Sequence, residues 1–467
     1  MSTNQFVRAQ TASPQAALPR ARPQAAAGTP DLQKVAQHMF SLMLRNVSSD
    51  GYPFADPSSP GNFSKPGCVI AAPSYPADTP GVNQDYVFNW VRDAAITAIE
   101  LAAAKMPTAP GAGVEPLVDY VNFAQLCQNN ATPTMGHAVF TIEGNARPWS
   151  EQNDGPAIQT LAMVQAFDQL DAGTQATAVA LMNKNTKYLL GVYENPTTNL
   201  WEEHSGLSFF ARAVQLKCFQ QLTGNTLGVD VPDGVAGAVE WLQNALQAHW
   251  NGTYYVTLLA PPAPGNANSP TIPPDQGYDP NMDIVQASVY GAIPFTDTKL
   301  LATAGQLWRQ WADGSSPHVY QINLADRELR LGPLLGRYPG DFYDGDTSAP
   351  VPGGHPWALC TSNFAELYYG LANEISRSQT VPVDALSTEF FGQVGITPAT
   401  SAADAVTALR NAGDAMLQAV VYHSDNLELS EQFDGTTGYE KSVRDLTWSY
   451  AAFLSAVRRR NAEAVEG

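Results

Sequence analysis

Apolar residues recur along most of this chain at the 3.6-residue spacing of a helix with one buried face. The first such stretch follows Thr29-Pro30, which we interpret as an N-cap and a first helical position. Its apolar residues share one face: Leu32, Val35, Ala36, Met39 and Met43. The same periodicity predicts about twelve helical segments, which lie near residues 31–46, 91–105, 115–130, 155–170, 173–191, 206–222, 232–249, 281–293, 297–313, 356–377, 400–423 and 442–460. Strand-like alternation is confined to short pieces such as residues 254–256, so the pattern favours an all-α fold.

Long stretches rich in glycine and proline interrupt the helices, at residues 50–84, 260–280 and 338–355. Loops longer than about 15 residues inside a compact domain usually serve a function. The clearest candidate chemistry lies in or just after such loops: Arg92-Asp93, Arg337-Tyr338 and Glu431. We therefore expect a helical toroid whose long loops form one mouth. A linker between two domains at residues 260–280 is the alternative, because composition alone does not separate a loop from a linker.

The start of the chain has a different composition. Residues 1–28 are rich in alanine, proline, glutamine and arginine, and they contain no acidic residue. They show no helical period, so we predict a disordered arm followed by a single domain over residues 29–467. No apolar segment of a secretory signal is visible in the arm. Because a signal can be encoded upstream and removed, the compartment stays open between the cytoplasm and an exported location.

The net charge of the chain argues against some classes of binding partner. The 467 residues include 25 basic and 44 acidic ones, which gives a net charge of −19. A strongly acidic surface repels phosphate backbones, so we exclude nucleic acid as a partner, whereas a neutral sugar is unaffected. No stretch approaches the roughly 18 consecutive apolar residues of a membrane span, so no membrane partner is expected. Hydrophobic residues make up 44% of the chain, enough for a substantial core, and we expect a monomer.

The cysteines are widely spaced and form neither a Cys-x-x-Cys pair nor a cluster with histidine: Cys68, Cys127, Cys218 and Cys360. Two of them, Cys127 and Cys218, lie in apolar helical patterns, where a free cysteine behaves as a small hydrophobic residue. We predict that all four are free, with one disulfide as the alternative. Neither a metal site nor redox chemistry is predicted, and no cofactor is expected.

Two stretches combine carboxylates with aromatic and amide side chains: Trp201-Glu202-Glu203, and residues 430–434, which read Ser-Glu-Gln-Phe-Asp. A glycosidic bond is cut by two carboxyl groups, of which one protonates the leaving oxygen and the other activates water or attacks directly. An aromatic neighbour can stack on a sugar ring and raise the pKa of the acid beside it. This combination indicates a glycoside hydrolase. Taken singly, each stretch also fits a solvated acidic turn, and Arg92-Asp93 also fits an ordinary helix start.

Taken together and in order, five blocks resemble the glucoamylase family, glycoside hydrolase family 15. The blocks are Asp85-Tyr86-Val87-Phe88-Asn89-Trp90-Val91-Arg92-Asp93-Ala94; Gln152-Asn153-Asp154-Gly155-Pro156-Ala157; Asn199-Leu200-Trp201-Glu202-Glu203 with Ser208-Phe209-Phe210; Gly336-Arg337-Tyr338-Pro339 with Asp341, Tyr343, Pro356-Trp357 and Cys360-Thr361; and Leu429-Ser430-Glu431-Gln432-Phe433-Asp434 continuing to Arg444-Asp445-Leu446-Thr447-Trp448-Ser449-Tyr450-Ala451-Ala452. They cover nearly the whole chain after the arm, so the resemblance is specific.

The resemblance implies an (α/α)6 barrel, in agreement with the helical segments counted from periodicity. It also implies an inverting, exo-acting enzyme that removes glucose from the non-reducing ends of α-1,4-linked glucans, acts more slowly on α-1,6 bonds, and releases β-glucose. By position, Glu202 is the implied general acid and Glu431 the implied general base. An inverting pair stands about 6.5–9.5 Å apart, which leaves room for a water molecule.

The same resemblance implies which residues bind the sugar. Arg92 and Asp93 are expected to hold the hydroxyls of the terminal glucose in a closed pocket, which explains exo action. Glu203 and Arg337 are expected to hold the next glucose, with Asp341 supporting the arginine. Tyr86 and Trp448 are expected to form walls of the pocket, and Trp201 is expected to shield the acid. The amide of Gln432 completes the expected substrate-binding residues.

The chain departs from the family pattern at two places. The family usually has an aspartate two residues before Trp-Glu-Glu, where this chain has Asn199. The loss of one negative charge lowers the expected pKa of the acid, if the site is otherwise unchanged. The family also carries a tryptophan just before an Arg-Pro pair, and residues 145–148 lack it. Trp149, in a Trp-Ser-Glu segment that looks inserted, either replaces that tryptophan or marks a reshaped pocket.

Soluble maltodextrins are the expected substrates. No starch-binding module is visible after the last helix, and without one the effective concentration on a starch granule is low. Two related specificities stay open, namely α-1,6 cleavage of isomaltose or dextran, and cleavage of trehalose. A sugar-binding protein without catalysis would need neither Glu202 nor Glu431. A phosphorylase on a similar barrel would need a phosphate pocket where Glu431 stands.

Overall fold

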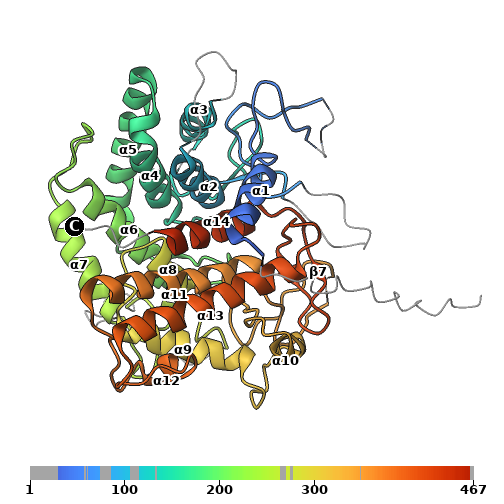
Figure 1. The fold of residues 1–467 in the computed structure, drawn as a ribbon. Helices are drawn as coiled ribbons and strands as arrows, with labels where there is room; N and C mark the ends of the chain where they lie inside the picture. Colours follow the sequence, from blue (N-terminus) through green and yellow to red (C-terminus); the bar gives the residue numbers. More distant parts are fainter. Residues whose placement is uncertain are drawn as a thin grey trace, which may run out of the picture.

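The computed structural model describes residues 30–56, 59, 61–73, 86–105, 115–131, 134–262, 270–273, 277–347 and 349–462. Within these ranges the chain forms fourteen α-helices and only short strands (Figure 1). The mostly helical fold predicted from the periodicity is therefore confirmed. The predicted arm over residues 1–28 lies outside the described residues, and so do Thr29 and Asp85.

Six helices form a ring in which each contacts the next and the last contacts the first. In order around the ring they are α2 (Val91–Ala104), α4 (Gly155–Ala166), α6 (Phe209–Leu222), α8 (Asp283–Val289), α11 (Ala358–Ser378) and α14 (Thr447–Asn461). The ring helices are buried on most sides, and every residue of α8 is buried. A helix that is covered nearly all round shows a weak apolar period, because apolar residues occur on most of its sides.

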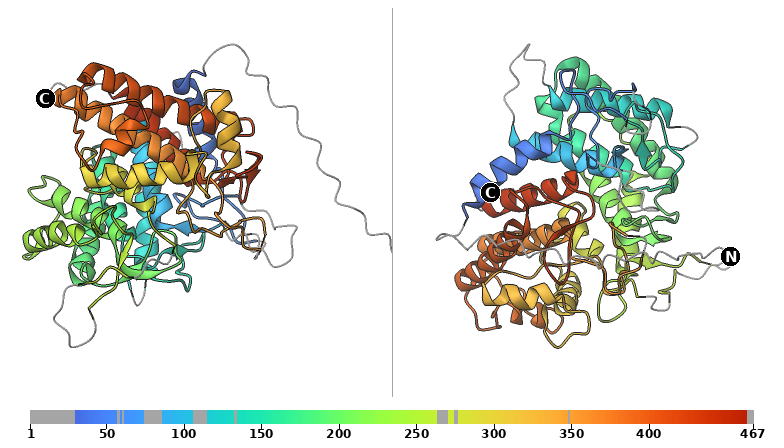
Figure 2. Two further views of the ribbon diagram at one scale, coloured as in Figure 1. Left: turned by 90° about the horizontal axis from the view of Figure 1, so that it is seen from below. Right: turned by 90° about the vertical axis from the view of Figure 1, so that its right-hand side faces the viewer.

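A second helix packs on each ring helix. These outer helices are α1 (Leu32–Leu44) on α14, α3 (Pro116–Asn130) on α2, α5 (Ala172–Val192) on α4, α7 (Val235–Gln247) on α6, α9 (Thr298–Ala312) on α8, and α13 (Ala402–His423) on α11. They bury one face and leave the other to solvent, so the helical period is clear in their sequences. The blue α1 lies beside the red α14 in Figure 1 and in the right view of Figure 2, so the first and last helices meet.

Short polar residues cap the outer helices. The Asp31 carboxylate accepts the backbone N–H of Gln33 at 3.1 Å and begins α1. The interpretation that Thr29-Pro30 begins this helix is therefore wrong by two residues, because the acceptor for the first turn comes from the aspartate that follows. Similar side-chain caps begin α5, α9 and α13, at Asp171, Asp297 and Ser401.

Each predicted helical segment contains one of these ring or outer helices. Two helices were not predicted, α10 (Gln321–Glu328) and α12 (Thr388–Gly392). Both have fewer than about three turns, too few to give a clear period. Helices α6 and α14 begin later than predicted, because residues 206–208 belong to a strand and residues 442–446 form bends.

The strands are short and antiparallel. Strand β1 (Asn89–Trp90) pairs with β2 (Val139–Phe140), β3 (Thr197–Thr198) with β4 (Ser205–Ser208), β4 with β5 (Leu258–Leu259), and β6 (Gln432–Phe433) with β7 (Glu440–Lys441). Strand β1 leads straight into α2, and β4 leads straight into α6. The pairs therefore fix the direction in which the chain enters the ring helices.

One hydrophobic cluster contains buried residues from Leu32 to Val457. The described part of the stretch at 260–280 packs against its neighbours: Ala260 pairs with Thr271, and the carbonyl of Gly277 accepts the N–H of Gly340. The shared core supports a single domain, which stays a prediction, as does the monomer.

All four cysteines are free and buried, as predicted. Burial raises the pKa of the Cys218 thiol to about 12, so this side chain stays neutral and serves as apolar filling. Among the residues that the structure describes, no helix is long and apolar enough to cross a membrane.

Candidate active site

The segments that lead into the ring helices meet one another and carry polar side chains. Arg92, in the first turn of α2, places Nη2 3.2 Å from Oε1 of Glu202, which lies before α6. Arg337, which lies before α11, places Nη2 2.8 Å from Oε1 of Glu203. Helix N-termini carry partial positive charge, so a place where several of them begin favours carboxylates. The ring thus gathers distant parts of the sequence into one site.

The hairpin between β3 and β4 carries two adjacent carboxylates. Asn199 fixes its loop, because its side-chain oxygen accepts the backbone N–H groups of Glu203 and His204 at 3.0 and 3.1 Å. Glu202 has a φ of 68°, a left-handed conformation that costs about 1–3 kcal/mol for a residue other than glycine. The bend sends the side chain of Glu202 to Arg92 and that of Glu203 to Arg337. The two neighbours therefore face different parts of the site.

Glu202 is held at both carboxylate oxygens. Arg92 donates to Oε1 at 3.2 Å, and the indole N–H of Trp149 donates to Oε2 at 3.0 Å. The side chain is 22% exposed, so a ligand can reach it. Burial raises its pKa to about 7, although the charge of Arg92 lowers it, and the charge of Asp93 raises it further. A carboxyl with this pKa keeps a proton just below neutral pH and can donate it.

Arg92 is buried and connects the groups around Glu202. Its Nη1 donates to Gln152 at 2.7 Å and to Asp154 at 2.9 Å. Its guanidinium carbon lies 5.3 Å from the ring centroid of Trp448. Burial raises the pKa of the neighbouring Asp93 to about 6, against the lowering effect of Arg92. A buried guanidinium next to a carboxylate and an aromatic ring can hold the hydroxyls of a neutral ligand.

Glu431 receives hydroxyl groups from several sides. Tyr86 donates to its Oε1 at 2.8 Å, and Tyr343 and Ser442 donate to its Oε2 at 3.1 and 2.5 Å. Glu431 is only 4% exposed. Burial raises its pKa, while the hydroxyls of Ser442, Tyr86 and Tyr343 and the charge of Arg337 lower it. These donors stabilise the ionised form and fix the orientation of the carboxylate.

Arg337 organises the groups on the other side of the site. It donates to Asp341 from Nε at 2.8 Å and from Nη2 at 2.7 Å, and it reaches Glu203 at 2.8 Å. Its guanidinium carbon lies 5.4 Å from the ring centroid of Trp201 and 5.1 Å from that of Trp357. Aromatic walls around a charged network suit a sugar, which has apolar ring faces and hydroxyl edges.

Comparison with known proteins identifies the family of the chain. Residues 42–458 match the family described as glycosyl hydrolases family 15. The chain belongs to this family. Its relatives include the glucoamylase of Saccharomycopsis fibuligera, 26% identical over 92% of this chain and 90% of the relative. Glucoamylase 1 of Rhizopus oryzae is 27% identical over 85% of this chain and 67% of the relative.

Solved structures of family 15 share the fold. The structure of the glucoamylase from Saccharomycopsis fibuligera matches with a TM-score of 0.72 at 22% identity, over 92% of this chain and 94% of that chain. The family 15 glucoamylase from Hypocrea jecorina matches with a TM-score of 0.73 at 23% identity, over 92% of this chain and 72% of that chain. The mostly helical architecture is therefore that of the family 15 glucoamylase structures.

In this family 15 glycoside hydrolase, the contacts just described bring most of the predicted site residues together. They connect both carboxylates and eight of the nine predicted substrate-binding residues: Glu202 and Glu431, with Tyr86, Arg92, Asp93, Trp201, Glu203, Arg337, Asp341 and Trp448. Their catalytic and binding roles stay predictions.

Gln432, the ninth, is placed differently. It is fully buried, its amide oxygen accepts the N–H of Gly345 at 3.1 Å, and its amide nitrogen donates to the carbonyl of Tyr343 at 3.2 Å. Both ends of the side chain hold a loop next to Glu431. A contact with the sugar stays a prediction.

Three further residues touch the two carboxylates. Tyr343 belongs to a matching block, although the sequence assigns it no role, and no signal in the sequence points to Ser442. The sequence offers Trp149 only as one way to replace a missing tryptophan. The structure places its indole on Glu202 and at right angles to Trp90, with ring centroids 5.3 Å apart. The Trp-Ser-Glu segment therefore brings a tryptophan to the acid.

The pKa of Glu202 is raised although Asn199 stands where the family usually has an aspartate. That an aspartate at this position would raise the pKa of Glu202 further stays a prediction. In this chain burial still raises the pKa of Glu202 to about 7. The amide nitrogen of Asn199 is buried and has no hydrogen-bond partner among the described residues, whereas its oxygen holds the loop.

The site offers carboxyl and hydroxyl groups for acid–base chemistry. Among the described residues, no group of three or more histidine, cysteine, aspartate or glutamate side chains could hold a metal ion.

Proposed function

We propose that this protein is an inverting, exo-acting glucoamylase that hydrolyses terminal α-1,4 bonds of soluble maltodextrins, acts more slowly on α-1,6 bonds, and releases β-D-glucose. The observation that carries the proposal is a pair of carboxyls in different environments. Glu202 has a pKa raised to about 7 and is open to a ligand. Burial also raises the pKa of Glu431, but this carboxyl accepts hydroxyl donors that favour its ionised form. Such a pair divides the work of an acid and a base.

In the proposed reaction, Glu202 gives its proton to the glycosidic oxygen while the bond between that oxygen and the anomeric carbon breaks. Glu431 removes a proton from a water molecule that attacks the opposite face of that carbon, so the configuration inverts. Glu202 is left as a carboxylate, and Arg92 at 3.2 Å stabilises that new charge. Tyr86 and Tyr343 keep the carboxylate of Glu431 oriented before the water reacts.

Binding of the sugar completes the proposal. Arg92 and Asp93 bind the terminal glucose against Trp448, and Glu203 and Arg337 bind the next one. This arrangement is supported by the separate directions of Glu202 and Glu203. A pocket that surrounds the terminal unit leaves no space for a chain that continues past it, which makes the enzyme exo-acting. The proposed fold is an (α/α)6 barrel, supported by the six ring helices and their six outer partners.

The proposal is tested by proton NMR of maltotriose during the first minutes of reaction. We expect the anomeric signal of β-glucose to appear first, together with maltose, before mutarotation produces the α form. α-Glucose as the first product would mean retention and would exclude water activation by Glu431. If maltotriose is not cleaved, the same experiment on isomaltose and trehalose identifies the specificity that replaces the proposed one.

The pH profile follows from the two carboxyls. Because Glu202 must be protonated and its pKa is about 7, we expect kcat/KM to fall as pH rises through about 7. Because Glu431 must be ionised and its pKa is raised above the ordinary 4.5, we expect the acidic fall to lie above pH 4.5. The charged neighbours are Arg92 and Asp93 around the acid and Arg337 near the base. Initial rates from about pH 3 to about pH 9 measure both limbs.

Trp149→Phe tests whether Glu202 sets the alkaline limb of the pH profile. The indole hydrogen bond lowers the pKa of Glu202, so its loss raises that pKa and moves the alkaline limb to higher pH. The acidic limb stays in place, because the indole of Trp149 bonds to Glu202 and the hydroxyls on Glu431 come from other residues. An alkaline limb that stays fixed in this variant would show that a group other than Glu202 sets it.

A further inference from the structure

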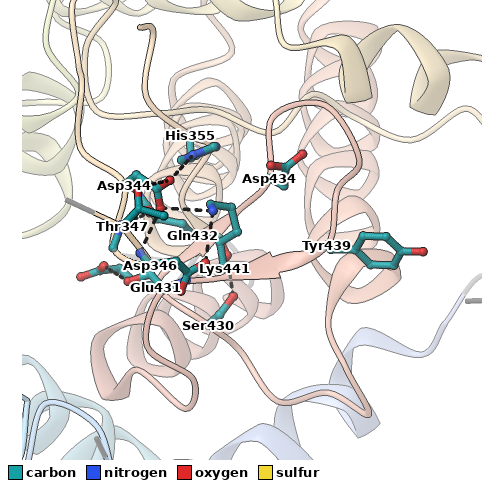
Figure 3. A network of polar contacts seen from close by, with 12 residues as sticks. Asp344, Asp346, Thr347, His355, Ser430, Glu431, Gln432, Asp434, Tyr439 and Lys441 are labelled. Atoms are coloured by element: carbon teal, nitrogen blue, oxygen red, sulfur yellow. Dashed lines mark hydrogen bonds and ion pairs between the residues drawn. The ribbon is translucent and has the colours of Figure 1, made fainter. Parts of the chain in front are cut away.

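A partly buried lysine joins two segments next to Glu431 (Figure 3). Lys441, at the end of β7, has Nζ 3.1 Å from Oδ1 of Asp344 and 3.1 Å from Oδ2 of Asp346. Its side chain is 17% exposed, and that of Asp344 is 5% exposed. One ammonium group therefore bridges two carboxylates of a loop that lies across the hairpin of β6 and β7. We call these three residues the Lys441 clamp.

Each segment held by the clamp also supplies a hydroxyl to Glu431. Tyr343 directly precedes Asp344 and donates to Oε2 of Glu431 at 3.1 Å. Ser442 directly follows Lys441 and donates to the same oxygen at 2.5 Å. The second carboxylate oxygen of Asp346, Oδ1, accepts the backbone N–H of Ser442 at 2.9 Å. The clamp and the two hydroxyls are thus adjacent in sequence on both segments.

The backbone at Ser442 is strained, and its surroundings are tightly packed. Ser442 has a φ of 62°, which is costly for a residue with a side chain. A Cβ atom on Gly345 would overlap the hydroxyl oxygen of Ser442, so the loop approaches as closely as glycine allows. Gln432 adds bonds to the backbone of Tyr343 and Gly345. Strain of this kind persists only where the surrounding contacts determine the conformation.

We propose that the Lys441 clamp is a positioning device for the general base: it holds the hydroxyls of Tyr343 and Ser442 on Glu431, and so sets the orientation and the proton affinity of that carboxylate. This inference rests on the proposed role of Glu431. The clamp residues do not touch the reacting atoms and act through Tyr343 and Ser442 alone.

Lys441 and Asp344 stay charged over the working range. Burial lowers the pKa of Lys441, but its bonds to Asp344 and Asp346 raise it above the ordinary value overall. Burial raises the pKa of Asp344, but the N–H of Asp346 and the ammonium of Lys441 lower it overall. His355, whose Nε2 is 3.9 Å from Asp344, has its pKa lowered by burial and by Lys441, so it is neutral near pH 7. The clamp therefore acts as a constant support.

The test compares Lys441→Met with Lys441→Arg. In the methionine variant the loop and the hairpin separate, and Glu431 loses hydroxyl donors that favour its ionised form. We expect kcat on maltotriose to fall about tenfold with KM within about twofold. We also expect the acidic limb of the pH profile to move up by about one pH unit. The arginine variant keeps the charge and restores most of the rate and the position of the limb.

Arg460→Met is the matched control. It breaks another charged pair, in which Nε of Arg460 lies 2.6 Å from Asp414 at the other end of α14 from Trp448. We expect a lower melting temperature without any change in kcat or in the acidic limb. If Lys441→Met behaves like this control, with a loss of stability and an unmoved acidic limb, the clamp is only structural and the inference is wrong.

A readout without turnover separates this inference from the proposed function. If maltotriose, isomaltose and trehalose are all left uncleaved by the wild type, the proposed function fails. The pKa of Glu431 is then read from the melting temperature. Because this pKa is raised in the folded state, Glu431 contributes stability at low pH that is lost as pH rises through it, and Glu431→Gln removes this dependence.

The difference in melting temperature between the protein with Glu431 and its Glu431→Gln variant is measured from about pH 3 to about pH 8. The measurement is made with lysine and with methionine at position 441. We expect the midpoint of the difference to move to higher pH in the Lys441→Met background. An unmoved midpoint would overturn the inference whatever the enzyme hydrolyses.

Discussion

Replacement of Glu431 by glutamine is expected to lower kcat on maltotriose about a thousandfold. The amide keeps the size of the side chain, and its oxygen can still accept a hydroxyl from Tyr86 or Ser442, but it cannot remove a proton from water. Because the proposed sugar-binding groups are Arg92 and Arg337, we expect the dissociation constant for maltotriose to stay within about threefold. Single-turnover rates and isothermal titration measure the two quantities separately.

The matched control is Glu440→Gln. Glu440 is a carboxylate in the same hairpin, and burial raises its pKa to about 7. It accepts the backbone N–H of Ser430 and has no contact with Tyr86, Tyr343 or Arg337 among the described interactions. We expect it to keep a rate near that of the wild type. A Glu431→Gln enzyme that is as fast as this control would remove the base from the mechanism.

Replacement of Glu202 by glutamine is expected to separate two kinds of substrate. On maltotriose the leaving alkoxide needs a proton, so kcat falls about a thousandfold. On α-glucosyl fluoride the leaving fluoride needs little assistance, so the rate stays within about tenfold of the wild type. Released glucose and released fluoride are measured on the same enzyme preparation.

The Glu431→Gln enzyme supplies the comparison for this result. Both substrates need an activated water, so loss of the base slows both of them. Loss of the acid slows only the substrate with the poor leaving group. Equal losses on both substrates in Glu202→Gln would contradict the role of Glu202 as a proton donor and would indicate a role in binding or folding.

The helices could be predicted because they are long and their apolar positions repeat. A helix such as α13, with its buried residues on one side, states its period clearly over 22 residues. Helices α10 and α12 have 8 and 5 residues and are held by their neighbours, so no local pattern marks them. The ring itself depends on contacts between distant segments. The long loops between the helices indicate a toroid, but only the resemblance to a known family implies its six-fold (α/α)6 form.

The site was predictable where a motif carried it and unpredictable where the path of a loop decided it. Gln432 begins strand β6 directly after the bend at Glu431. Its side chain binds the backbone of Tyr343 and Gly345, whereas that of Glu431 accepts the hydroxyls. Trp149 reaches Glu202 across 53 residues of sequence, and Ser442 reaches Glu431 through a left-handed turn. The residues next to Trp149 and Ser442 in the sequence do not predict either contact.

The packing of α1 on α14 has a consequence for how the molecule is made. Asn46, just after α1, donates to Thr447 at 2.7 Å across 401 residues, and the ring closes only when α14 joins α2 and α11. During synthesis the ribosome releases α14 after the other five ring helices. The apolar surfaces that α14 covers on α2 and α11 therefore stay exposed until then. Contacts of such long sequence separation form slowly, and the waiting surfaces are prone to aggregate. Chaperone assistance during synthesis is therefore expected to raise the yield of active enzyme.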